Sequence, residues 1–142
     1  MTQTNDNNIA RLNKLIKGIE VAMLITCESD GTLHSRPMAA QKADFDGDLW
    51  FFTRAGSHKV EEIEREHHVN LSYADPSNQR YISVSGLARL VRDRSRIDQL
   101  WDASYTTWFP EGKDDADLAL LRVTVQRAEY WEGASSNVIN FG

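Results

Sequence analysis

Residues 49–63 read Leu49-Trp-Phe-Phe-Thr-Arg-Ala-Gly-Ser-His-Lys-Val-Glu-Glu-Ile63, a hydrophobic strand that runs directly into a helix. Ser57 follows a glycine break and is a good N-cap residue, so the helix is expected to begin near His58. Val60 and Ile63 are spaced for one buried face of that helix. The stretch therefore predicts a strand-to-helix corner at the edge of a hydrophobic core.

The first turn of this helix carries two basic side chains, His58 and Lys59. A helix N-terminus favours anions, so each positive charge there is unfavourable by roughly 0.3–1 kcal/mol. With a phosphate group present, the free backbone N–H groups, the Ser57 hydroxyl and the Lys59 ammonium would all converge on it. The stretch therefore also predicts a phosphate-binding corner.

Composition describes one ordinary globular domain. The chain has 142 residues, 41% of them hydrophobic and 26% charged. No run approaches the roughly 20 apolar residues that span a bilayer, and the N-terminus lacks the features of a signal peptide, so we expect a cytoplasmic protein without membrane contact. The formal charge of -5 argues against nucleic-acid binding.

The first half of the chain alternates strands with turns. Apolar residues at three- and four-residue intervals predict a helix from about 8 to 18, and strands are expected at 21–27, 33–43 and 49–53. The Asp46-Gly47 pair is a strong hairpin signal, so these three strands are predicted to form an antiparallel meander.

The second half continues with longer strands. We expect strands at 69–74, at 81–91 with a bend at Gly86, and at 118–131, with a helix after the N-cap residue Asp93. The tally is six strands with three main helices that do not alternate regularly with them, which favours an antiparallel barrel with helices outside. We divide the chain into a flexible N-terminus (1–8), one domain (9–133) and a C-terminal tail (134–142).

A second cation lies in the strand at 33–43. Pro37 cannot donate to a sheet ladder, so Arg36-Pro37-Met38 marks an edge or a bulge. In isolation Arg36 is best interpreted as a solvated strand residue. In the expected hairpin, however, Arg36 and Ser57 lie at the same end of the barrel and could share one anionic ligand.

The irregular segment 104–116 holds three aromatic residues, Tyr105, Trp108 and Phe109. They could plug the barrel end, form a dimer contact or line a pocket for a planar ligand. The nearby aspartates, Asp114, Asp115 and Asp117, lack the spacing of a calcium loop and are interpreted as solvated charges.

Protein-only catalysis and metal binding have little support. Cys27 is the single cysteine and is expected to be a small buried core residue. The four histidines form no pair with metal-ligand spacing, no catalytic triad is recognisable, and no metal site is expected. Catalytic residues stay unassigned. A phosphate corner beside aromatic residues instead suggests a phosphorylated aromatic cofactor that itself performs any redox chemistry.

Five motifs in this order resemble a known family. They are Gly-Thr-Leu-His-Ser-Arg-Pro-Met, Leu-Trp-Phe-Phe-Thr-x-x-x-Ser-x-Lys-x-x-x-Ile, Val-Ser-Gly-x-Ala, Trp-Phe-Pro-x-Gly-Lys-Asp-Asp and Leu-Arg-Val-x-x-x-x-Ala-Glu-Tyr-Trp. The chain resembles the general stress proteins among the pyridoxamine 5′-phosphate oxidase-like flavoproteins. The resemblance covers about residues 9–133. It implies a mainly β fold with flanking helices, a six-stranded antiparallel split β-barrel that binds FMN at the interface of a homodimer.

The resemblance also implies which residues hold the cofactor. Arg36, Ser57 and Lys59 fall where the family grips the FMN phosphate, with His58 beside them, and Met38, Phe52 and Thr53 fall along the ribityl and isoalloxazine path. Trp108, Phe109 and Trp131 would complete the pocket across the dimer, or serve packing alone. The expected cofactor-binding set is Arg36, Pro37, Met38, Phe52, Thr53, Ser57, His58, Lys59, Trp108, Phe109 and Trp131.

Two departures from the family pattern shape the expected function. The oxidase proper has a further C-terminal Trp and an Arg-x-Pro-x-Arg-like segment, whereas this chain ends in residues 134–142 without them, so vitamin B6 oxidation is not expected. An imidazole at His58 also makes the phosphate contact partly pH-dependent. The expected function is an FMN-dependent redox protein; a non-catalytic flavin carrier or sensor, or a barrel that binds heme or deazaflavin, are the alternatives.

Overall fold

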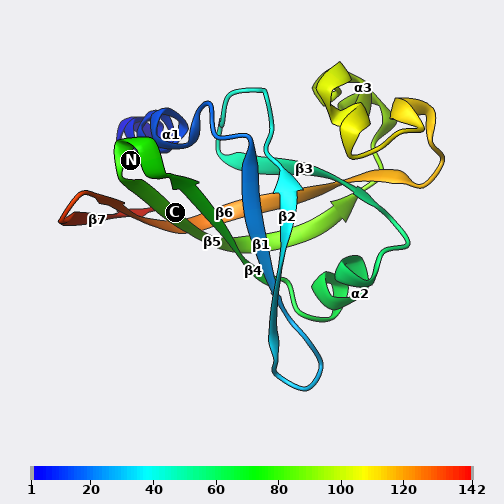
Figure 1. Cartoon of the computed structure of the whole chain (residues 1–142), viewed down its shortest axis with the longest axis horizontal. Helices are drawn as coiled ribbons and strands as arrows, with labels where there is room; N and C mark the ends of the chain where they lie inside the picture. The colour runs from blue at the N-terminus through cyan, green and yellow to red at the C-terminus, as the bar shows by residue number, and fades with distance from the viewer. Residues whose placement is uncertain (1, 142) are drawn as a thin grey trace.

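Seven strands build a single antiparallel sheet in the computed structural model, which describes residues 2–141, with side chains from Asn5 onward. The strands are β1 Val21–Cys27, β2 Leu33–Ala39, β3 Asp48–Arg54, β4 His68–Asp75, β5 Arg80–Val91, β6 Leu118–Glu132 and β7 Ser135–Asn140. The helices are α1 Thr2–Ile16, α2 His58–Arg65 and α3 Arg94–Leu100, with short 3-10 turns at Pro76–Asn78, Ala103–Thr107 and Gly112–Asp114. The sheet curls into an open barrel and the helices lie around it (Figure 1), which confirms the expected split barrel.

The order of the strands differs from the meander predicted for the first half of the chain. The hydrogen-bonded order is β2-β1-β4-β5-β6-β3, so β2 pairs with β1 as expected, but β3 pairs along its whole length with β6. The connection between β2 and β3 is anchored elsewhere: Phe45 is buried and its backbone N–H donates to Asn13 Oδ1 on α1 at 2.9 Å. The predicted β2–β3 hairpin is therefore wrong, because a core side chain pulls its loop onto a helix.

Both ends of the chain carry more regular structure than the sequence indicated. Helix α1 begins at Thr2, before the expected Asn8, and its buried residues Leu12, Leu15 and Ile16 cover one end of the barrel. Residues 135–140, placed in a C-terminal tail, form the seventh strand against β6 and bury Ile139. The flexibility expected for residues 1–8 stays a prediction. Among the described residues no helix is long and apolar enough to cross a membrane.

The two helices that follow strands begin where their capping residues predict. Ser57 is the N-cap of α2, and Asp93 is the N-cap of α3, where its carboxylate accepts from the backbone N–H groups of Ser95 and Arg96. Ser57 makes no such side-chain bond to its own helix. Its hydroxyl is therefore left for other partners.

Side chains of the sheet bury two separate hydrophobic clusters. The main cluster fills the barrel around Leu24, Phe51 and Leu71, and α1 and α2 close it. The second cluster lies between the β3–β6 pair and the segment that follows α3, and it consists of Phe52, Ile97, Tyr105, Phe109, Leu118 and Leu120. Cys27, expected in the core, is half-buried at the end of β1. The aromatic segment thus belongs largely to the second cluster.

Strand β5 bends at Gly86, as predicted. The register with β6 shifts between Ser85 and Gly86, and a Cβ atom added to Gly86 would lie 2.5 Å from the carbonyl oxygen of Thr124 and 2.8 Å from Val123 Cγ1. A bulge of this kind needs glycine because the neighbouring backbone occupies the place of a side chain.

The Gly86→Ala substitution is therefore expected to lower the free energy of unfolding by roughly 1–3 kcal/mol, the usual cost of overpacking a core. Urea denaturation of the variant and of the wild-type protein measures this change in the free energy of unfolding. Gly56→Ala is the control, because a Cβ there meets only the Asp117 carboxylate, at 3.7 Å. Equal stability of the two variants would contradict the steric argument.

Candidate functional site

A cavity of about 180 Å³ opens at the corner between β3 and α2. Strand β2, strand β3, the first turn of α2 and the aromatic segment each contribute residues to its lining. The lining residues are Pro37, Met38, Ala39, Phe52, Arg54, Ser57, Lys59, Trp108 and Phe109. Seven of the eleven residues predicted to hold the cofactor thus line one cavity within a single chain.

Lys59 is the most informative group in this cavity. Its Nζ donates to the hydroxyl groups of Thr53 at 3.1 Å and Ser57 at 3.4 Å, and Thr53 is itself buried. No carboxylate of residues 5–141 forms an ion pair with Lys59. Burial, and then the positive charges of Arg36 and Arg54, hold the pKa of the Lys59 ammonium below its usual value. A half-buried cation without a counter-charge is the electrostatic signature of an anion site.

Arg54 is a second cation of the cavity that sequence reasoning missed. It ends β3, and because side chains alternate along a strand it shares a face with Phe52. This two-residue alternation was the sequence signal that could have placed Arg54 on the same face as Phe52. Its guanidinium donates to Asp115 at 2.8 Å and lies 5.8 Å from the ring centre of Phe109. Asp115 is thus a partly buried ion-pair partner, with a side chain 14% exposed, and not the solvated charge that the sequence suggested.

Arg36 lies beside the cavity but does not line it. Its Nη2 donates to the Thr26 hydroxyl at 2.8 Å and lies 3.6 Å from Glu62 Oε1, within the space between β1, β2 and α2. The β2–β3 hairpin that was expected to bring Arg36 and Ser57 to the same end of the barrel does not form, because those strands do not pair. Arg36 is nevertheless close enough to Lys59 to depress its pKa.

His58 also points away from the cavity. Its side chain is 71% exposed, and its two ring nitrogens face Glu61 at 3.6 Å and Glu62 at 3.7 Å. Together Glu28, His58 and Glu62 bring potential metal-ligand atoms within 4.8 Å of one another, a grouping that their distant sequence positions did not reveal. The Arg36 guanidinium already supplies positive charge at Glu62.

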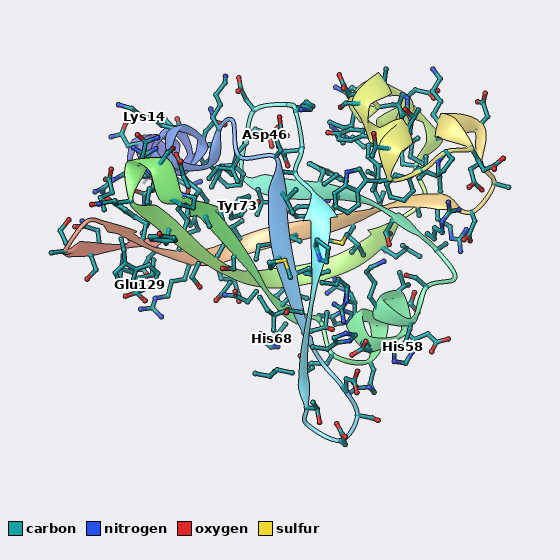
Figure 2. The ribbon with its side chains drawn as sticks, viewed as in Figure 1. Lys14, Asp46, His58, His68, Tyr73 and Glu129 are labelled. Carbon is teal, nitrogen blue, oxygen red and sulfur yellow. The ribbon has the colours of Figure 1, made fainter. Side chains whose placement is uncertain are left out.

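The aromatic residues divide into wall and packing. Trp108 is 39% exposed and lines the cavity, whereas Phe109 and Tyr105 are buried in the second cluster. Trp131 lies elsewhere, paired with Tyr81 and Ser136 at the far end of β6. Figure 2 shows this separation, because Glu129 of the same end and His58 lie on opposite sides of the molecule.

Known proteins with the same fold are numerous. A family model described as pyridoxamine 5′-phosphate oxidase like matches residues 7–142. Protein bli-3 of Neurospora crassa is 28% identical over 88% of the chain, which spans 65% of that relative's length. A general stress FMN/FAD binding protein from Xanthomonas citri is 27% identical over 100% of this chain and 97% of its own, with a TM-score of 0.73. A Clostridium acetobutylicum protein related to general stress protein 26 is 20% identical over 95% of both chains, with a TM-score of 0.80, and shows the fold alone.

Proposed function

This chain belongs to the pyridoxamine 5′-phosphate oxidase like family, and on that premise we propose that it is a flavoprotein that binds FMN at the corner between β3 and α2. The observation that carries the proposal is Lys59, a half-buried ammonium that contacts two hydroxyl groups and no carboxylate of the described side chains. A phosphate group supplies the missing negative charge. The 27% identical protein from Xanthomonas citri is a general stress FMN/FAD binding protein, which supports a flavin as the ligand.

The rest of the cavity suits the remainder of FMN. Ser57 and Lys59 would hold the phosphate, and the apolar side chains of Met38, Phe52 and Trp108 would contact the less polar part of the cofactor. Arg54 adds positive charge at the same opening. Bound flavin supplies the capacity to accept and donate electrons, while these residues bind and orient it.

We propose further that a second copy of the chain completes the site. Ligand pockets usually measure about 300–1,000 Å³, and the cavity of one chain is about 180 Å³. Exposed aromatic residues on the outer face of the sheet, Tyr81 at 45% and Trp131 at 37%, are suited to a protein interface. A homodimer would let Trp131 of one subunit approach the cavity of the other, which its own chain does not allow.

Two roles for the bound flavin are supported to different degrees. The first role is that of an FMN-dependent oxidoreductase, and it is supported by the ability of flavin itself to transfer electrons. A carrier or sensor without turnover is the second, because Arg54 and Lys59 are the ionisable residues among those that line the cavity, and neither a carboxylate nor an imidazole is among them.

The proposal is tested on protein purified from cells that make flavins. We expect a yellow protein whose cofactor, released by denaturation, has the mass of FMN, at one molecule per chain, and a scattering mass of two chains. If the released material is FAD, heme or deazaflavin, that molecule is the cofactor and the assignment of FMN is wrong. A colourless protein that does not bind added FMN would refute flavin binding. Anaerobic reduction by NADH or NADPH then separates the oxidoreductase from the carrier.

A further inference from the structure

A buried carboxylate lies next to the proposed phosphate corner. Glu62 is on α2, one turn after His58, and is 4% exposed. Its Oε2 accepts from the Thr26 hydroxyl at 3.3 Å, and its Oε1 has no hydrogen-bond partner among the described atoms. An anion buried beside an anion-binding corner is unexpected, because it opposes the binding of a second negative charge.

The groups around Glu62 Oε1 are mostly cationic. Arg36 Nη2 lies at 3.6 Å and His58 Nε2 at 3.7 Å, distances that give charge compensation without a hydrogen bond. A second carboxylate, that of Glu28, belongs to the same cluster as His58 and Glu62, and it lies 3.4 Å from Nδ1 of His34. Two carboxylates and an imidazole are the ligand types of a metal site. Here, however, the Arg36 guanidinium supplies the positive charge next to Glu62.

This arrangement fixes where Arg36 points. The Arg36 side chain is 15% exposed and its guanidinium is held by Thr26 and Glu62, outside the set of residues that line the cavity, although its positive charge lowers the pKa of Lys59. An anion bound at Lys59 would attract Arg36 and repel Glu62. The two anions therefore compete for one guanidinium.

We propose that Glu62 is a built-in counter-anion that competes with the ligand's phosphate group for Arg36 and thereby limits how strongly the site prefers a phosphorylated flavin to an unphosphorylated one. This inference rests on the proposed function, since it concerns the same corner. Glu62 acts through Arg36 and does not itself contact the cavity, so it is a specificity-determining residue and not a catalytic residue.

The test is flavin titration of the Glu62→Gln variant, which keeps the shape of the side chain and removes its charge. We expect FMN to bind about tenfold more tightly than to the wild-type protein, and riboflavin, which has no phosphate, to bind equally well to both. Glu61→Gln is the matched control: it removes the same charge from the adjacent position, where the side chain is 77% exposed, and should change neither affinity.

Further results of the same titrations support or overturn the inference. The gain in FMN affinity should disappear when Arg36→Gln is added, because Glu62 then has no guanidinium to withhold. If Glu62→Gln does not fold, Glu62→Asp moves the carboxylate away from Arg36 by one methylene and should give a smaller gain in the same direction. Unchanged or weaker FMN binding in the folded variant overturns the inference alone, whereas wild-type protein that binds no FMN overturns the proposed function and this inference with it.

Discussion

The Lys59→Met variant is expected to bind FMN roughly 10- to 100-fold more weakly than the wild-type protein, since a hydrogen bond to a charged group contributes about 1.5–3 kcal/mol. The same variant, without ligand, should be more stable than the wild-type protein. Lys59 contacts Thr53 and Ser57 but no carboxylate of the described side chains, so the folded chain contains a positive charge that a ligand alone can balance. Loss of binding together with a gain of stability distinguishes a binding residue from a structural one.

The sign of the stability change follows from the lowered pKa of Lys59. Because burial and the nearby arginines lower the pKa in the folded protein, the unfolded chain binds the proton more tightly and protonation favours unfolding. The stability cost is fully present below the depressed pKa. It is relieved as the pH rises from that value to the ordinary lysine value of 10.5.

Two measurements check this expectation. FMN and riboflavin titrations should show that the loss in Lys59→Met is confined to the phosphorylated ligand, and urea denaturation of the ligand-free proteins between neutral and alkaline pH should show the stability difference shrinking. Lys14→Met, on the exposed surface of α1, is the control and should change neither quantity. Equal FMN affinity of Lys59→Met and wild type would place the phosphate elsewhere.

Local sequence signals were sufficient for most of the elements. Val21–Cys27 forms β1 with the expected limits because its apolar side chains alternate between core and surface, and α2 begins at His58 because Ser57 precedes it. The bend at Gly86 was equally local, since glycine in a long strand marks a bulge. The phosphate corner could also be predicted from local sequence, because the strand, the N-cap residue and Lys59 lie within eleven consecutive residues, 49–59.

The errors concern which distant segments meet. The partner of β3 is β6, and the turn signal at Asp46-Gly47 could not show that Phe45 is buried against α1. The orientation of the Arg36 side chain depends on Thr26 and Glu62, which lie on two other elements. The local sequence therefore indicated a positive charge in β2 but not where the guanidinium points. Strand β7 exists because β6 is long enough to pair with it, although its own sequence is largely polar.

Phe52→Ala is expected to lower the free energy of unfolding by roughly 3–5 kcal/mol, the usual cost of removing a buried aromatic side chain. The Phe52 ring is 7% exposed and packs against three aromatic residues, with centroid distances of 5.3 Å to Trp101, 5.3 Å to Tyr105 and 6.4 Å to Phe109. It therefore joins α3 and the aromatic segment to the sheet. Its removal should loosen the whole cavity wall as well as reduce stability.

Trp108→Ala provides the comparison that separates packing from binding at this wall. Trp108 lines the same cavity but is 39% exposed and lies outside the second cluster, so its loss should change the free energy of unfolding by no more than about 0.5 kcal/mol. FMN binding should nevertheless weaken, because an aromatic face of the pocket is gone. Urea denaturation and FMN titration of both variants test this division. A large stability loss in Trp108→Ala, or a small one in Phe52→Ala, would show that the aromatic segment is attached to the sheet through other contacts than the Phe52 ring.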